Sequence, residues 1–313
     1  MKVLVLGGTG CMGNYLCPKL VERGFEVDAV TLDPVQSEKA GLTYIVKAAT
    51  DGLVEELMQK GYDAVVDFMW YDTPSFQNRY ETFLKNTKHY IALSSYRVYA
   101  DSKEPLSEES ARLLDTVKDP IFLASDDYAQ AKCRIENLLR AYPRKNWTIV
   151  RPVVVYGGAR LPLVTVGVDR ILELTAQGKS VPIPKAAMEK TAAIIWAGDA
   201  AEMIARLVLN EQAYGETYLL GSSKQVTWRE VYGYYQELTG MTGEEKDTED
   251  FLTAMHGRVL SPTDCSRWIL EYDRLYDRKI NNLKVLKATG LKQSDLTTVK
   301  DALKIELEKR EKQ

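Results

Sequence analysis

The chain has 313 residues, of which 45% are hydrophobic and 27% are charged, and its formal net charge is −3. This is an ordinary globular balance, long enough for a dinucleotide-binding domain and a smaller second lobe. No Lys/Arg block stands out and no apolar run approaches a membrane span, so neither nucleic acid nor membrane is an expected partner.

Cysteine and histidine usage limits the site chemistry and the compartment. The four cysteines form no Cys-x-x-Cys pair, and the two histidines lie far apart in the sequence. We therefore expect free thiols in a reducing cytoplasm and no metal site. The apolar run Val3–Leu6 is too short for a signal peptide, which agrees with a cytoplasmic protein.

The first predicted element is a strand that leads through a glycine loop into a helix. Lys2–Leu6 is apolar, and a helix-like stretch from Asn14 to Arg23 follows the loop. Glycine lets the backbone turn sharply beside a pyrophosphate, and the free amides of a helix start bind anions. A plain structural turn is the alternative. The loop residues predicted to bind a dinucleotide are Gly7, Thr9, Gly10, Cys11, Met12 and Gly13.

A second apolar run, Phe25–Leu32, ends at Asp33, which lies 20 residues after Gly13. A carboxylate at this place can accept hydrogen bonds from the adenosine ribose diol and would repel a 2′-phosphate. We therefore predict NAD as the cofactor, and Phe68, after the fourth strand, is predicted to contact it as well.

The first half of the chain alternates apolar runs with helical patterns, which predicts crossover units and a parallel sheet. After Gly157 the sequence is mostly helical. We predict an α/β, Rossmann-like doubly wound sheet formed by residues 1–157 and about 191–220. A smaller, mostly helical substrate lobe is predicted from about 158–190 and 221–313. Expected strands are Lys2–Leu6, Glu26–Leu32, Thr43–Val46, Ala64–Phe68, Tyr90–Leu93, Thr148–Val155, Ala192–Ile195 and Tyr218–Leu220, and Asp264–Asp277 is expected to be a helix.

The segment from Tyr128 to Lys132 predicts a catalytic pair. Residues four apart share a helix face, so the Lys132 ammonium is expected to lie near the Tyr128 hydroxyl and lower its pKa. Tyr-x-x-x-Lys also occurs at Tyr15 and Tyr99, but only Tyr128 starts a clean helix, with Ser125 or Asp126 as its cap. An exposed helix face is the alternative interpretation.

Ser94 and Ser95 follow the apolar run Tyr90–Leu93. A serine just past a parallel strand end lies where ligands bind in such sheets, and its hydroxyl can hydrogen-bond a substrate oxygen. A serine-rich turn is the ordinary explanation for this pattern.

These motifs occur in the order Gly loop, Ser-Ser-x-x-Val-Tyr, Tyr-x-x-x-Lys and Arg151-Pro152-Val153-Val154-Val155-Tyr156-Gly157. Together they resemble the extended short-chain dehydrogenase/reductase superfamily, in its NAD-dependent epimerase/dehydratase branch. The resemblance implies that Ser95, Tyr128 and Lys132 form a catalytic triad and that Tyr128 and Lys132 contact the cofactor. It implies hydride transfer from a sugar carbon to NAD, most simply in a nucleotide-sugar epimerase or reductase, and it suggests a homodimer.

Other positions depart from the family pattern. Ala192 stands where the family often has an arginine that pairs with the substrate diphosphate, so we consider Arg160, Arg267 and Arg278 as replacements, although each alone reads as a surface arginine. Tyr96-Arg97 replace the Asp-Glu pair of a 4,6-dehydratase, which disfavours dehydration. A different class stays open: an NAD(H)-sensing regulatory or RNA-binding member of the same fold without turnover.

Overall fold

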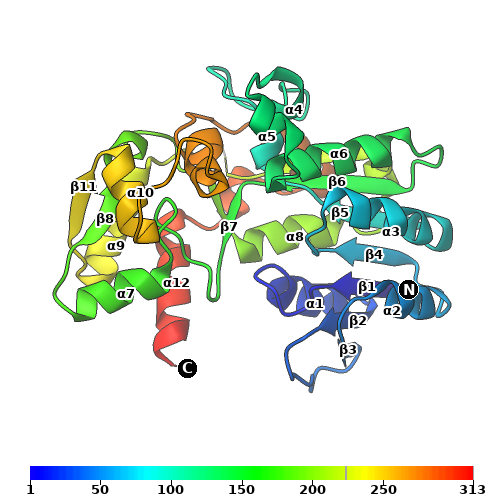
Figure 1. Ribbon diagram of the computed structural model, residues 1–313. Helices are drawn as coiled ribbons and strands as arrows, with labels where there is room; N and C mark the ends of the chain where they lie inside the picture. Colours follow the sequence, from blue (N-terminus) through cyan, green and yellow to red (C-terminus); the bar gives the residue numbers. More distant parts are fainter. Residues whose placement is uncertain (223, 313) are drawn as a thin grey trace.

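The computed structural model describes residues 1–222 and 224–312 and is built around one seven-stranded parallel sheet (Figure 1). The strand order is β10-β6-β5-β4-β1-β2-β3, with every neighbouring pair parallel. This confirms the predicted Rossmann-like doubly wound sheet. Its strands are β1 (Lys2–Leu6), β2 (Glu26–Thr31), β3 (Leu42–Val46), β4 (Ala64–Asp67), β5 (His89–Leu93), β6 (Trp147–Pro152) and β10 (Glu216–Leu220).

Helices cover both faces of this sheet because successive side chains of each strand point to opposite faces. Val3 and Val5 pack in the cluster that contains α1 (Gly13–Glu22), α8 (Ala197–Leu207) and α11 (Leu283–Thr289). Leu4 and Leu6 pack instead with α2 (Asp51–Met58), α3 (Thr73–Asn86) and α6 (Tyr128–Ala141). The carboxyl ends of the strands are thereby left for the loops that form the site.

The elements outside the sheet gather mainly at one side of it, where Figure 1 shows α7, α9, α10 and α12 around a small sheet. That small sheet pairs β8 (Val181–Pro184) with β11 (Gly243–Lys246), and a second one pairs β7 (Val154–Tyr156) with β9 (Ile194–Trp196). The helices are α4 (Leu113–Thr116), α5 (Pro120–Ala124), α7 (Val168–Ala176), α9 (Trp228–Thr239), α10 (Thr248–His256) and α12 (Val299–Glu311). Short helical turns are η1 (Tyr96–Val98), η2 (Lys185–Ala187), η3 (Glu211–Ala213), η4 (Cys265–Arg267), the π-helical η5 (Leu270–Arg274) and η6 (Gln293–Asp295).

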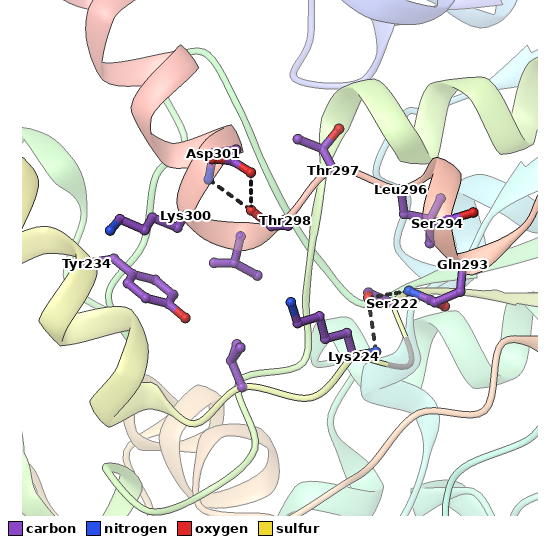
Figure 2. Close-up of a pocket in the computed structure, with 12 residues that line it drawn as sticks. Ser222, Lys224, Tyr234, Gln293, Ser294, Leu296, Thr297, Thr298, Lys300 and Asp301 are labelled. Atoms are coloured by element: carbon purple, nitrogen blue, oxygen red, sulfur yellow. Dashed lines mark hydrogen bonds between the residues drawn. The ribbon is translucent and has the colours of Figure 1, made fainter.

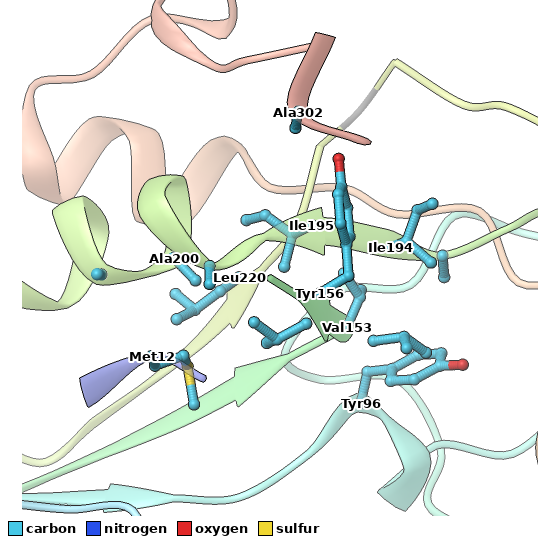
Figure 3. Close-up of a cluster of buried hydrophobic side chains, with 14 of the residues drawn as sticks. Met12, Tyr96, Val153, Tyr156, Ile194, Ile195, Ala200, Leu220 and Ala302 are labelled. Carbon is cyan, nitrogen blue, oxygen red and sulfur yellow. The ribbon is translucent and has the colours of Figure 1, made fainter. Parts of the chain in front are cut away.

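One apolar cluster joins the glycine loop to the C-terminal elements (Figure 3). Met12 from the loop, Tyr156 from β7, Ile195 from β9 and Ala302 from α12 all belong to it, and all are buried. The last helix therefore packs into the same core as the glycine loop.

The strands of the structure differ from the predicted ones at one segment, and two more strands were not predicted. The run Thr148–Val155 is not one strand, because Val153 donates to Leu220 at 2.9 Å and the chain then leaves the large sheet to pair with β9. β8 and β11 were not expected at all. β8 contains two prolines and β11 is Gly-Glu-Glu-Lys, so neither has the apolar pattern of a strand. Both sequences are tolerated because each strand is an edge of a two-stranded sheet.

The segment Asp264–Asp277 is not a continuous helix, contrary to the prediction. It consists of η4 and then the π-helical turn η5, which contains Asp273 and Arg274. Both of these consecutive residues contact the Tyr96 hydroxyl. In a regular α-helix they would point about 100° apart, and π-helical turns are frequent at functional sites.

Among the described residues, no helix combines the length and the apolar character that crossing a membrane requires.

Candidate active site

The glycine loop is shaped by close contacts rather than by flexibility alone. Gly7 has φ +83°, and the amides of Gly7 and Gly8 both donate to the Val30 carbonyl, at 3.0 and 2.9 Å. A Cβ on Gly8 would lie 2.6 Å from the Ala29 Cβ, and one on Gly13 would lie 2.6 Å from the Gly8 carbonyl oxygen. Gly8 was missed in the sequence, where only spacing singled out the other three glycines.

The start of α1 faces the glycine loop, and the amides of Asn14 and Tyr15 donate to the Gly10 and Met12 carbonyls, each at 3.1 Å. Met12 is its N-cap residue, and no side chain among the described residues caps it. Helix amides without partners carry partial positive charge, and a glycine loop lets a phosphate approach them. The loop that contains Gly10 and Gly13 therefore fits a diphosphate.

The predicted ribose contact lies next to the glycine loop. The Thr9 hydroxyl donates to Asp33 at 2.5 Å and lies 2.5 Å from the hydroxyl of Thr31. Asp33 itself is exposed, so its carboxylate retains lone pairs for a ribose diol. Phe68 packs over Gly7, since a Cβ on that glycine would lie 3.3 Å from the Phe68 Cβ.

A cavity of about 600 Å³ runs along this loop toward the last helix. Thr9, Gly10 and Cys11 line one part, and Arg160, Glu306 and others line the rest. Cys11 is half-buried, and its burial raises the thiol pKa to about 11, so this thiol is protonated near neutrality. The volume and the uncapped helix start together fit part of a dinucleotide.

The predicted Tyr128–Lys132 pair stands at the first turn of α6. Asp127 caps that helix by accepting from the Ala129 amide at 3.1 Å. The expected caps, Ser125 and Asp126, were therefore wrong. Asp126 instead accepts from the amide and hydroxyl of Thr73, at 2.6 and 2.7 Å, and so ties α3 to the start of α6.

Lys132 is buried, and its ammonium lies 5.7 Å from the centroid of the Tyr128 ring. It donates to the Leu93 carbonyl at 2.6 Å. Burial lowers the pKa of Lys132 to about 8, although the carboxylates of Asp67 and Glu136 oppose that shift. The ammonium is thus held between the end of β5 and the tyrosine.

The two serines after β5 have different environments. Ser94 is buried and donates to Glu136 at 2.6 Å, so its hydroxyl is used inside the protein. The Ser95 hydroxyl accepts from the Arg97 amide at 3.2 Å and so caps η1. Both serines line one cavity of about 270 Å³ together with Tyr128. The structure thus places Ser95 and Tyr128 around one space, with Lys132 beside the tyrosine.

A matched ion pair supports the wall behind Ser94. Arg151 donates to both carboxylate oxygens of Glu136, at 2.8 and 2.6 Å, and also to the Tyr99 hydroxyl at 2.8 Å. Burial would raise the pKa of Glu136, but Arg151 outweighs burial and holds it below the usual value. The sequence marked Arg151 only as part of a motif, without its partner.

A second group of charges surrounds Asp273. Arg274 and Arg278 both donate to its carboxylate, and Arg97 lies 3.6 Å from it. The Tyr96 hydroxyl donates to the same carboxylate at 2.5 Å. We call Arg97, Arg274 and Arg278 the arginine cluster. Burial raises the pKa of Tyr96, yet Arg274 and Arg278 outweigh that effect and lower it overall.

The arginines proposed from the sequence have different positions. Arg160 is exposed and lines the cavities at both Thr9 and Ser95. Arg267 and Arg278 are buried, so their description as surface arginines was wrong. Arg267 pairs with Glu249 and Glu271, whereas Arg278 belongs to the arginine cluster. Arg274 was not recognised, because no local motif marks it, and Arg97 was noted only as a departure from the dehydratase pattern.

Another cavity, of about 600 Å³, lies at the start of α12 (Figure 2). Hydroxyls, amides and two lysines form its walls, and it shares no lining residue with the cavity at Tyr128. It is lined by Ser222, Lys224, Val226, Tyr234, Gln293, Ser294, Leu296, Thr297, Thr298, Val299, Lys300 and Asp301.

Comparison with known proteins places this chain in context. The model of the NAD dependent epimerase/dehydratase family matches residues 3–221. The chloroplast stem-loop binding protein of 41 kDa b from Arabidopsis thaliana is 26% identical over 244 residues. That alignment covers 72% of this chain and 60% of the plant protein, so the chain spans less than two thirds of that relative.

Solved structures share the fold over the whole chain. UDP-glucuronic acid 4-epimerase from Bacillus cereus, in complex with NAD, has a TM-score of 0.70 at 16% identity, covering 98% of this chain and 96% of that one. dTDP-glucose 4,6-dehydratase from Bacillus anthracis, in complex with NAD, has a TM-score of 0.73 at 16% identity, covering 100% and 97%. At such identities the likeness shows the fold alone.

Proposed function

The chain belongs to the NAD dependent epimerase/dehydratase family and has NAD as its cofactor, and from this premise we propose that it oxidises or reduces a sugar carbon. The proposed substrate is a nucleotide sugar, and the reaction is an epimerisation or a reduction. The observation that supports this proposal is the shared cavity of Ser95 and Tyr128, with the buried ammonium of Lys132 beside the tyrosine.

The proposed mechanism follows from these positions. When bound, NAD supplies the hydride acceptor. Tyr128 takes the proton of the substrate hydroxyl while the C–H bond of the same carbon breaks, so that a carbonyl forms. The hydroxyl of Ser95 holds the substrate oxygen. Lys132 and Arg97 lie near the Tyr128 ring, at 5.7 and 5.2 Å from its centroid, so two cations surround the proposed base.

The residues that follow Ser95 argue against water elimination. A dehydratase needs an acid and a base near the reacting carbon, whereas Tyr96 donates to Asp273 and Arg97 is a guanidinium that cannot accept a proton. An epimerase and a reductase need only Ser95, Tyr128 and Lys132. We therefore propose either an epimerase or a reductase. We also propose that residues of about 158–190 and 221–313 form the substrate lobe, that the protein is a homodimer, and that it is cytoplasmic.

Replacing Tyr128 with Phe tests the proposal directly. We expect Tyr128→Phe to lose about 10²- to 10⁴-fold in turnover, the range that general acid–base groups contribute. NAD binding should change little, as judged by mass spectrometry of nucleotide released on denaturation and by titration with added NAD. Tyr214→Phe, at a half-buried tyrosine whose ring packs at a tilt against His89, is the matched control. Undiminished turnover in Tyr128→Phe would refute the assignment.

The plant relative favours one second candidate, because its name describes binding to a nucleic-acid stem-loop. An RNA-binding role without turnover would be supported by saturable, salt-dependent anisotropy of a labelled RNA hairpin. The net charge of −3 argues against it. Hairpin binding together with no turnover on any nucleotide sugar would replace the enzyme proposal.

A further inference from the structure

The cavity at Ser95 has cationic walls. Arg97, Arg160 and Arg274 line it together with Ser95 and Tyr128, and no Asp or Glu is among its lining residues in the part of the chain that the structure describes. A space of about 270 Å³ with guanidinium groups and no carboxylate among its lining residues is suited to an anionic group.

Behind this wall, guanidinium groups outnumber the carboxylates that lie within salt-bridge distance of them. The arginine cluster places three guanidinium groups around the carboxylate of Asp273, and Asp127 adds a second carboxylate 3.7 Å from Arg97. Within salt-bridge distance three guanidinium groups face two carboxylates, and the carboxylate of Asp101 acts on Arg278 from farther away. Arg274 and Arg278 are almost fully buried, and unbalanced buried charge is costly unless a partner arrives.

Arg97 in particular has unused hydrogen-bonding capacity. Its two carboxylate contacts are 3.6 and 3.7 Å long, beyond hydrogen-bond distance, and its Nε is buried with no partner among the described residues. Its guanidinium lies 5.2 Å from the centroid of the Tyr128 ring. A group held by Arg97 would therefore lie close to the atom that the tyrosine deprotonates.

The backbone that holds Arg274 is strained. Val164 has φ +57°, in the left-handed region that a β-branched residue rarely adopts, and its carbonyl accepts from Arg274 at 3.0 Å. Such strain persists only where the surroundings enforce it, and it is concentrated at functional sites. It is a second, independent sign that the position of Arg274 is specified.

The cofactor does not account for Arg97 and Arg274. The cavity that fits the dinucleotide phosphates is lined by Thr9 and Gly10, and of the cavity arginines only Arg160 reaches it. Arg97 comes from η1 and Arg274 from η5, both on the Tyr128 side. The cofactor phosphates therefore give Arg97 and Arg274 no role.

We infer that Arg97 and Arg274 form a subsite for a carboxylate or phosphate carried on the reacting unit of the substrate, so that the enzyme acts on an acidic sugar in preference to its neutral counterpart. This inference rests on the proposed function. It places the anion on the sugar itself, beside the carbon that exchanges hydride. The diphosphate that links the sugar to the nucleotide is not the group bound here.

The test compares two nucleotide sugars that differ at one carbon, UDP-glucuronic acid and UDP-glucose. Their dissociation constants for the NAD-loaded protein are measured by calorimetry. We expect the acidic sugar to bind about 10-fold or more tightly, because hydrogen bonds to charged groups are the stronger ones. Arg97→Gln and Arg274→Gln should reduce that ratio toward 1 while the affinity for NAD stays unchanged. Arg170→Gln, at an exposed arginine paired with Glu173 on α7, should keep the ratio.

Each outcome is decisive. Equal binding of the two sugars, or a preference that survives in Arg97→Gln, overturns the inference even if Tyr128→Phe has abolished turnover. A rise in the NAD dissociation constant of both variants would assign the arginines to the cofactor and would overturn it as well. If neither sugar binds, inorganic phosphate at constant ionic strength is titrated while ³¹P line width is measured. Saturable broadening that is lost in Arg97→Gln supports the subsite, and its absence refutes it.

Discussion

Two buried groups of charges, one around Glu136 on α6 and one around Asp273, are organised differently. In one, Arg151 meets Glu136 through two hydrogen bonds, and Arg112 lies 3.7 Å from the same carboxylate. In the other, three arginines share Asp273, with Asp127 at a distance. The Arg151–Glu136 pair satisfies both partners through two short hydrogen bonds, so it can hold the wall behind Ser94 in place. A group in which guanidinium donors lack close carboxylate partners can still bind an anion. We take this as the difference between a binding surface and a structural one.

The largest expected loss of stability comes from a variant of the Arg151–Glu136 pair. Glu136→Gln should lower the free energy of unfolding by about 3–5 kcal/mol, because it leaves Arg151 buried without a counter-ion. Urea denaturation measures it. Glu173→Gln, in an exposed pair with Arg170, should change stability by only about 0.5 kcal/mol. Similar losses in the two variants would mean that the Glu136 pair has no special structural role.

The pH dependence of stability gives a second test, at Lys132, a buried cation on which the carboxylate of Glu136 acts. Its folded pKa of about 8 lies below the ordinary 10.5 because of burial. Between these values the unfolded chain binds the extra proton, so stability should rise with pH across this window. Lys132→Met should remove about 1–3 kcal/mol of that rise, by the 1.36 kcal/mol per pKa unit of linkage. Identical pH slopes in the wild type and the variant would contradict the buried ammonium.

A smaller effect concerns anions in solution. Sodium phosphate at constant ionic strength should stabilise the wild-type protein by about 1.4 kcal/mol at ten times its dissociation constant, the value expected from linked binding. Arg274→Gln should lose this stabilisation, whereas Arg258→Gln, at an exposed arginine paired with Asp264, should retain it. Equal stabilisation of both variants would show that phosphate acts elsewhere on the surface.

The same contrast explains how far the sequence could be interpreted. The glycine loop, Asp33 and the pair Tyr128 and Lys132 each follow from short spacings, and the sheet follows from alternating strands and helices. The structure confirms that sheet and brings these residues to its carboxyl edge, while their catalytic and binding roles stay predictions. The local errors also had local causes, since Ser125, Asp126 and Asp127 are adjacent and equally able to cap a helix.

The arginine cluster could not be predicted in this way. Arg97 and Asp273 are 176 residues apart in the chain, and they meet only because a segment after η4 packs against η1. Nothing in the sequence near Arg278 distinguishes a buried guanidinium from an exposed one. Sequence spacing therefore located the proposed chemistry, whereas the charge balance that points to the substrate required the fold.

One pair of stability measurements tests the central claim without any ligand. Arg151→Met removes a buried guanidinium, and Arg97→Met removes a half-buried one. The free energy of unfolding of each variant is measured by urea denaturation of the cofactor-free protein. We predict opposite signs. Arg151→Met should destabilise by about 3–5 kcal/mol, whereas Arg97→Met should stabilise by about 1 kcal/mol because it relieves uncompensated charge. Destabilisation of similar size in both variants would show that Arg97 is a structural partner and that no anion site awaits a substrate.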